Sequence, residues 1–204
     1  MKIICIGRNY LDHAKELNSA IPKEPVFFLK PDSALLIRNR PFYYPEFSHD
    51  VHYEVELVLK IKRVGKNILE ENANTYIDSI GLGIDFTARD IQRQCIKEGL
   101  PWEVAKAFDR SAVISDDFIP RENFSNLGKI EFHLNLNGIT VQKGNSRDMI
   151  FNFAKLIEHV SRFMTLKMGD LIYTGTPAGV GPVKIGDRLE GFIGAEKLLD
   201  FKVK

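Results

Sequence analysis

Residues 51–64 read VHYEVELVLKIKRV, and this stretch determines how the rest of the sequence is interpreted. Every second residue from Val51 to Ile61 is apolar, which is the period of a β-strand with one buried face. The alternate positions carry two glutamates, Glu54 and Glu56, together with a histidine and two lysines. The pattern therefore predicts a long strand that presents two carboxylates on one face.

The two glutamates can be interpreted in two ways. Residues two apart on a strand point to the same side, so the carboxylates would stand about 7 Å apart. Like charges repel there, and burial would raise their pKa unless a cation compensated. A solvent-facing polar strand explains the pair equally well, because His52, Lys60 and Lys62 share that face.

Asp85 favours the functional interpretation of Glu54 and Glu56. It closes the apolar run of residues 80–86, IGLGIDF, where a charged residue is poorly placed unless something requires it. Two glutamates and an aspartate would form an all-oxygen site that suits Mg²⁺, Mn²⁺ or Ca²⁺. The sequence has no paired cysteine and histidine pattern, which argues against structural zinc.

The other elements predict one α+β domain over residues 1–204, mostly strands, with one long helix. Asn137-Gly138 between alternating apolar runs predicts a type I′ hairpin. Apolar spacing predicts the long helix over Met149–Met164, started by Ser146 or Asp148. A further helix is expected after Thr87, which can cap it, and Gly99 closes it.

Three further groups could carry chemistry. His13 and Glu16 are three residues apart, so on a helix a carboxylate can orient an imidazole as a general base, although such pairs are also common on solvated helices. Arg89 and Lys106 could bind a substrate carboxylate, or they could be surface cations. The glycine-rich loop at 174–181, TGTPAGVG, could present backbone amides to an anion or form a tight turn.

The amino-acid composition narrows the classes of molecule that the protein is expected to bind. Lysine and arginine number 28 against 27 acidic residues, so no basic field favours nucleic acid. No apolar run approaches the ~18 residues that cross a membrane. Two cysteines, Cys5 and Cys95, without an export signal predict free thiols in a reducing cytoplasm. The expected partner is therefore a small molecule.

Several segments, taken in order, resemble the fumarylacetoacetate hydrolase family, especially its small acylpyruvate hydrolases and oxaloacetate decarboxylases. The matching segments are GRNY at 7–10 with His13 and Glu16, KP at 30–31, YEVEL at 53–57, GIDFTARD at 83–90, GLPW at 99–102, and TGTP at 174–177 with GVG at 179–181. The resemblance implies a barrel-like roll of mixed β-sheets that forms a homodimer.

The resemblance also implies roles for residues. Glu54, Glu56 and Asp85 would hold Mg²⁺ or Mn²⁺, with Ca²⁺ as a substitute. His13 and Glu16 would act from a mobile lid at about residues 10–21, with Lys106 as a third catalytic residue. Substrate would contact Arg8, Arg89, Gln92, Thr174 and Thr176. Larger family members draw a fourth metal carboxylate from the first strand, but residues 2–7 contain no acid.

The function implied first is hydrolysis of the C3–C4 bond of 2,4-diketo acids, such as acylpyruvates and fumarylpyruvate, to pyruvate and a carboxylic acid. Oxaloacetate decarboxylation and keto–enol tautomerisation (isomerisation) of 2-oxo acids are alternatives, because each passes through an enolate that a cation stabilises. A rival from another class is a non-catalytic β protein whose carboxylates bind a cation for stability.

Overall fold

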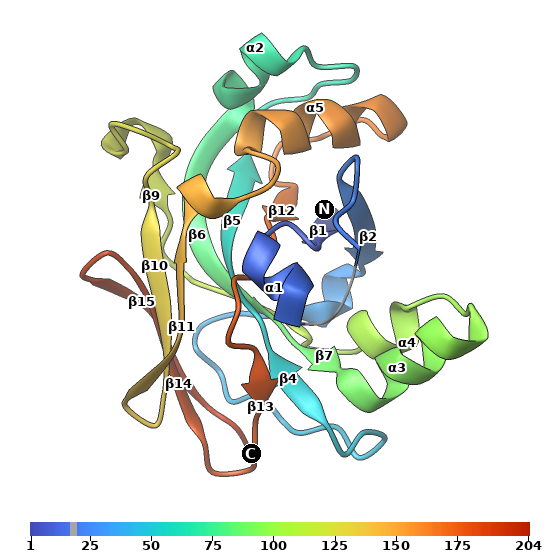
Figure 1. The fold of residues 1–204 in the computed structure, drawn as a ribbon. Coiled ribbons are helices and arrows are strands. Elements are labelled where there is room, and N and C mark those ends of the chain that lie inside the picture. The colour runs from blue at the N-terminus through green and yellow to red at the C-terminus, as the bar shows by residue number, and fades with distance from the viewer. Residues whose placement is uncertain (17–19) are drawn as a thin grey trace.

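Strands dominate the computed structural model, which describes residues 1–16 and 20–204 (Figure 1). The largest sheet has eight strands, of which β9 pairs only with β6. In spatial order they are β2 (Val26–Lys30), β1 (Ile3–Gly7), β12 (Leu171–Tyr173), β5 (Val55–Ile61), β6 (Ile77–Asp85), β8 (Ala112–Ile114) and β3 (Leu35–Leu36), with β9 (Ile119–Pro120).

Two smaller sheets complete the β structure. The four-stranded sheet consists of β11 (Ile139–Asn145), β10 (Glu131–Leu136), β14 (Arg188–Ile193) and β15 (Glu196–Lys202). The three-stranded sheet consists of β13 (Gly181–Pro182), β4 (Val51–Tyr53) and β7 (Thr87–Ala88). Because β1 runs parallel to β12 while β5 and β6 are antiparallel, the large sheet is mixed. It curls into the half-open barrel seen in Figure 1, which confirms the expected mostly-β roll.

Short helices connect the strands. They are α1 (Leu11–Glu16), α2 (Glu70–Ala73), α3 (Arg89–Glu98), α4 (Glu103–Lys106) and α5 (Phe153–Phe163), with single 3₁₀ turns η1 (Asp32–Ala34), η2 (Asn74–Tyr76), η3 (Arg121–Asn123) and η4 (Ser146–Asp148). None of the helices within the described ranges has the length and apolar character needed to cross a membrane.

The main hydrophobic core lies between the curled sheet and the four-stranded sheet. Leu57 and Leu82 from the curled sheet belong to the same buried cluster as Phe132 and Leu199 from the smaller one. Helix α5 adds Leu156 and other apolar residues to that cluster. This packing buries the odd-numbered face of residues 51–61, as the alternation predicts, and leaves the even-numbered side for other contacts.

The long strand expected over 51–64 is interrupted at Glu54 and ends at Ile61. β4 pairs with β13 and β7, whereas β5 pairs with β12 and β6. The chain therefore passes from one sheet to another at this residue. Pairing with different neighbours is a long-range property, so the sequence alternation alone could not reveal the break.

The long helix begins later than the sequence predicts. Residues 149–152 are not helical, because the backbone of this segment bonds to Asn9: Ile150 N–H donates to its carbonyl and Phe151 N–H to its side chain, both at 2.8 Å. Asn152 caps α5 by accepting from Lys155 N–H at 2.9 Å. The expected starting residues, Ser146 and Asp148, lie in the separate turn η4.

The α3 region confirms one end of the expected helix and corrects the other. Gly99 closes α3 in the left-handed conformation, at φ 68°. Thr87 does not cap it, because the helix starts after Ala88 without a side-chain cap. At the hairpin, Asn137 and Gly138 have φ values of 53° and 81°, as a type I′ turn requires.

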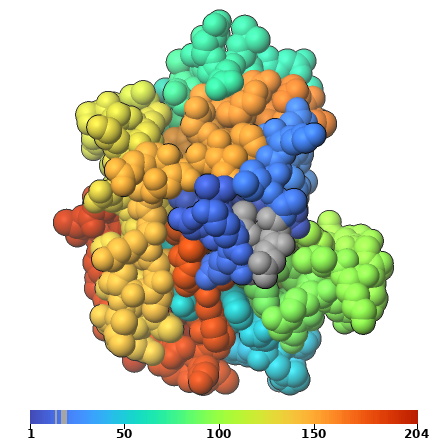
Figure 2. Space-filling model, viewed as in Figure 1, coloured from blue at the N-terminus to red at the C-terminus, as the bar shows by residue number. Residues whose placement is uncertain are grey.

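The described residues of the expected lid are 10–16 and 20–21, and they include α1. In Figure 2, the blue segment that contains α1 lies over the middle of the face turned toward the viewer. It lies beside the orange-red segment that leads into β13. Residues 17–19 of the expected lid lie outside the described residues, and the mobility of the lid stays a prediction.

The cap of α5 gives a stability prediction. Asn152→Ala removes the side chain that accepts from Lys155 N–H, so we expect the free energy of unfolding to fall by about 1 kcal/mol, measured by urea denaturation. Asn123→Ala is the matched control, because this exposed asparagine makes no side-chain hydrogen bond among the described residues. Equal losses in the two variants would contradict the assignment of the cap.

Candidate active site

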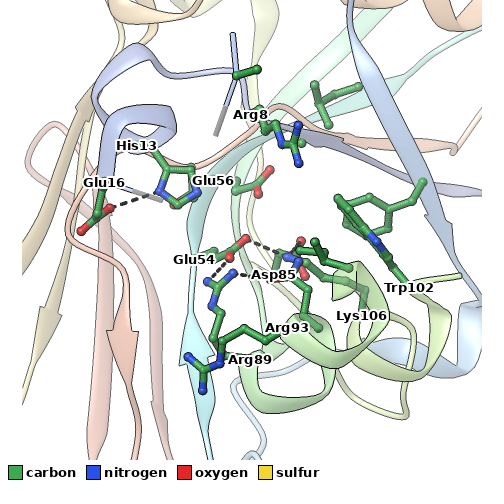
Figure 3. Close-up of a pocket in the computed structure, with 17 residues that line it drawn as sticks. Arg8, His13, Glu16, Glu54, Glu56, Asp85, Arg89, Arg93, Trp102 and Lys106 are labelled. Carbon is green, nitrogen blue, oxygen red and sulfur yellow. Dashed lines mark hydrogen bonds and ion pairs between the residues drawn. The ribbon is translucent and has the colours of Figure 1, made fainter. Parts of the chain in front are cut away.

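All the candidate site residues expected from the sequence except Thr174 meet in one cavity of about 490 Å³. Figure 3 shows His13 and Glu16 on one side of three carboxylates and Trp102 on the other. The lining residues in the described chain are Ile6, Gly7, Arg8, His13, Glu16, Ala20, Phe28, Glu54, Glu56, Asp85, Arg89, Gln92, Arg93, Ile96, Trp102, Lys106 and Thr176. The volume is typical of small-molecule sites, which span about 300–1,000 Å³.

Three buried carboxylates form the floor of the cavity. Glu54, Glu56 and Asp85 each offer one oxygen, and these oxygens all lie within 4.8 Å of one another. Asp85 N–H donates to the Glu54 carbonyl at 2.9 Å, which holds the end of β6 against the break between β4 and β5. The solvent-facing interpretation of the glutamate pair is therefore wrong, since both side chains are buried.

Cations from separate elements balance part of this charge. Lys106 Nζ lies 2.8 Å from both Glu54 Oε2 and Asp85 Oδ2. Arg89 Nη2 lies 2.5 Å from Glu54 Oε1. Lys30 Nζ is 2.6 Å from Asp85 Oδ1, an ion pair without hydrogen-bond geometry, so this oxygen has no hydrogen-bond partner in the described chain.

The carboxylates differ in how well their charge is compensated. Burial would raise the pKa of Glu54, but Lys106 and Arg89 outweigh it and hold that pKa well below its usual range. Burial, Asp85 and Glu54 together raise the pKa of Glu56 well above its usual range, against the opposing effects of the bond from Gly175 N–H at 2.6 Å and of the Lys106 charge. Glu56 thus carries the least compensated charge of the three.

These residues fit a divalent cation. The donor set is all oxygen, it is buried, and its atoms converge, which is what hard cations such as Mg²⁺ and Mn²⁺ require. A cation would relieve the incomplete compensation at Glu56 and would give Asp85 Oδ1 a ligand contact in addition to its ion pair with Lys30.

The histidine–glutamate pair on α1 is also present. His13 Nδ1 lies 3.2 Å from Glu16 Oε2, and the imidazole is buried. The Glu16 carboxylate accepts from Gly179 N–H at 3.2 and 3.3 Å, which connects α1 to the glycine-rich loop. With Nδ1 engaged by Glu16, the other ring nitrogen, Nε2, remains available for chemistry.

The expected substrate residues fall into two groups. Arg8, Arg89, Gln92, Lys106 and Thr176 line the cavity. Thr174 is absent from the lining, because its buried hydroxyl donates to the Leu57 carbonyl at 2.9 Å. Their contacts with substrate stay predictions.

Sequence reasoning missed several residues of the site. Lys30 belongs to the family segment KP at 30–31, and its position at the end of the apolar strand VFFLK is a signal that it could have a role in the site. Phe28, Ile96 and Trp102 form an apolar part of the wall, with the rings of Phe28 and Trp102 6.3 Å apart. Trp102 stands in the family segment GLPW at 99–102, but no local pattern distinguished Phe28 and Ile96 from ordinary apolar residues.

Both the sequence and the fold are similar to those of known proteins. A family model described as fumarylacetoacetate (FAA) hydrolase C-terminal matches residues 2–200. The chain is 42% identical to the Mus musculus protein named oxaloacetate tautomerase FAHD1, mitochondrial, over 99% of this chain and 91% of the relative. It is 43% identical to an oxaloacetate decarboxylase, mitochondrial, of Dictyostelium discoideum, over 99% and 93% of the two chains.

The structure is also similar to a solved fumarylpyruvate hydrolase from Pseudomonas aeruginosa, described in complex with Mn²⁺ and pyruvate. The TM-score is 0.94 at 35% sequence identity, covering 100% of this chain and 89% of that one. The relatives thus include proteins named for tautomerisation, decarboxylation and hydrolysis of small keto acids.

The buried ion pairs predict a large effect of removing Lys106. Lys106→Met leaves Glu54 and Asp85 without their shared cation, so we expect the free energy of unfolding in EDTA to fall by about 3–5 kcal/mol, measured by chemical denaturation. Lys15→Met, which breaks the exposed pair with Asp12, should change it by at most about 1 kcal/mol. A similarly small change for both variants would show that Lys106 does not balance the buried charge.

Proposed function

The chain belongs to the fumarylacetoacetate hydrolase family, and we propose that it interconverts the keto and enol forms of oxaloacetate in the cavity described above. The observation that carries this proposal is the position of the His13–Glu16 pair opposite three buried carboxylates in a single cavity. The Mus musculus relative, a named oxaloacetate tautomerase, supports this reaction ahead of the C–C bond hydrolysis that the sequence placed first.

The reaction moves one proton between C3 and the C2 oxygen. His13 Nε2 accepts the C3 proton, and Glu16 at Nδ1 stabilises the imidazolium that results. The same imidazolium, or water at the cavity mouth, returns a proton to the C2 oxygen to complete the enol. The reverse sequence converts the enol to the keto acid, so no atom is gained or lost.

The enolate between these steps needs positive charge around its oxygen. Lys106 is held as a cation, because Asp85 and Glu54 raise its pKa against the opposing effect of burial. Mg²⁺ or Mn²⁺ held by Glu54, Glu56 and Asp85 would add the charge that lowers the energy of the enolate. The Mn²⁺ in the similar fumarylpyruvate hydrolase supports a cation of this class.

Arg8 is the best candidate to bind one of the two carboxylates of oxaloacetate. Arg89 is already paired with Glu54, and Arg93 with Asp50. Arg8 lines the cavity and has no carboxylate partner among the residues that the structure describes. Its φ of 58° lies in the left-handed region, which is uncommon for a residue other than glycine and is often found at functional sites.

Hydrolysis of acylpyruvates is the second candidate, with decarboxylation of oxaloacetate as a side reaction of the same site. The similarity to fumarylpyruvate hydrolase and the apolar wall of Phe28, Ile96 and Trp102 favour it, because an acyl group longer than a carboxymethyl could pack there. In that reaction His13 would deprotonate a water molecule instead of C3.

Two family-based expectations accompany the proposal. We propose a homodimer, from the resemblance alone. We also propose a reducing compartment such as the cytoplasm, supported by Cys5 and Cys95, which are both buried and free. The two curated relatives above are named as mitochondrial.

The proposal predicts the effect of removing the base. His13→Ala should lower kcat for oxaloacetate tautomerisation by about 10²- to 10⁴-fold, the usual contribution of a general base, as followed by the loss of enol absorbance. Mn²⁺ binding should persist, because His13 is not among the clustered oxygen donors. His133→Ala is the control, since this histidine stacks on Phe192 in the four-stranded sheet.

The same preparations separate the alternatives. Pyruvate release from a short acylpyruvate and from oxaloacetate, with Mn²⁺ and with EDTA, measures hydrolysis and decarboxylation side by side. Faster acylpyruvate cleavage than tautomerisation would make the protein a C–C bond hydrolase. A protein that binds Mn²⁺ but neither turns over these acids nor binds oxalate would be a non-catalytic cation-binding protein.

A further inference from the structure

We propose that Gln142, a residue of β11 outside the cavity, is a positioning residue that fixes the distance between the carboxylates and the His13–Glu16 pair. The inference rests on the proposed function of the same site. Gln142 does not line the cavity and is 1% exposed, so it acts on substrate only through other residues.

The side-chain amide of Gln142 is fully engaged. Its Oε1 accepts from Val55 N–H at 3.0 Å. Its Nε2 donates to Thr176 Oγ1 at 2.9 Å and to the Pro177 carbonyl at 2.8 Å. A buried amide of this kind costs free energy unless each of these bonds is made, so its geometry is tightly specified.

The first of these bonds acts on the carboxylate strand. Val55 lies between Glu54 and Glu56, at the point where the chain leaves the three-stranded sheet for the curled one. Gln142 binds the N–H of Val55, and Thr176 Oγ1 donates to its carbonyl at 2.9 Å. Val55, Gln142 and Thr176 therefore form a closed ring of hydrogen bonds around the peptide groups that aim both glutamates.

The other bonds act on the glycine-rich loop. Gly175 N–H donates to Glu56, and Gly179 N–H donates to Glu16, so one loop holds both a carboxylate of the triad and the partner of the base. Gln142 binds this loop between the two glycines, at Thr176 and Pro177. Gly179 packs so closely on β11 that an added Cβ would lie 2.4 Å from the Val141 carbonyl oxygen.

The side chain of Gln142 therefore has two expected effects, one on cation binding and one on kcat. Loss of the bond to Val55 frees the backbone between Glu54 and Glu56, which weakens cation binding. Loss of the bonds to the loop frees the amide of Gly179 that orients Glu16, which lowers kcat. Supporting residues behind metal ligands typically contribute about 10- to 100-fold in metal affinity or activity.

The test uses Gln142→Met, which removes all three bonds at similar volume, and Gln142→Glu, which keeps an acceptor for Val55 but loses both donors. Mn²⁺ affinity is measured by calorimetry, and kcat and KM by oxaloacetate tautomerisation. We expect Gln142→Met to weaken Mn²⁺ binding and to lower kcat by about 10- to 100-fold each, and Gln142→Glu to lower kcat with a smaller change in affinity.

Two comparisons separate positioning from simple stability. Ser146→Ala removes another buried side chain near the end of β11, which bonds the Ile130 and Leu127 backbone, and it should lower stability without changing Mn²⁺ affinity. Thr176→Val opens the ring of hydrogen bonds from its other side and should also weaken Mn²⁺ binding, while Thr176→Ser should restore it. This second pair tests the proposal even where Gln142 variants do not fold.

Unchanged Mn²⁺ affinity and kcat in folded Gln142→Met would overturn the inference, as would losses no larger than those of Ser146→Ala. Failure of the proposed function is visible separately, because wild-type protein would then bind no Mn²⁺ or leave oxaloacetate unconverted before any variant is compared.

Discussion

The repulsion between three buried carboxylates is the constraint on which the rest of the structure depends. Oxygens of Glu54, Glu56 and Asp85 lie within 4.8 Å of one another, and all three side chains are buried. Buried charges persist only when they are paired, because the desolvation of each ion costs several kcal/mol. Lys30, Lys106 and Arg89 provide this pairing from β2, α4 and α3, so three distant segments are held around the same point.

The negative charges of the three carboxylates are balanced to different degrees. Glu54 and Asp85 have lysine or arginine partners, while Glu56 has one backbone amide and a raised pKa. One carboxylate of the three, Glu56, is thus left without a lysine or arginine partner at hydrogen-bond distance. Lys106 and Arg89, which pair with these carboxylates, also line the cavity that we propose as the active site.

Much of this site could be predicted from local patterns. The alternation of residues 51–61 correctly identifies the buried apolar face, and Asp85 is conspicuous because a charge ends an apolar run. The spacing of His13 and Glu16 predicts a contact that the structure confirms. These features depend on residues that are neighbours in sequence, where the geometry of strands and helices is fixed.

The features that were missed depend on distant partners. The break at Glu54 follows from the pairing of β4 and β5 with different strands, and the late start of α5 follows from bonds to Asn9, 142 residues away. The Thr87 hydroxyl oxygen accepts a hydrogen bond from Lys106 Nζ instead of capping α3. Gln142 reaches Val55 across 87 residues. No local periodicity encodes such contacts, since they arise only when the sheets pack together.

Titration of the metal-free protein with Mn²⁺ is the most direct test of this account, with Glu56→Gln as the comparison. Glu56→Gln keeps an oxygen that can accept from Gly175 N–H but removes the least compensated charge. The account predicts one saturable Mn²⁺ per wild-type chain and a loss of binding in the variant. Absence of saturable binding in the wild type, or equal binding in both, would contradict it.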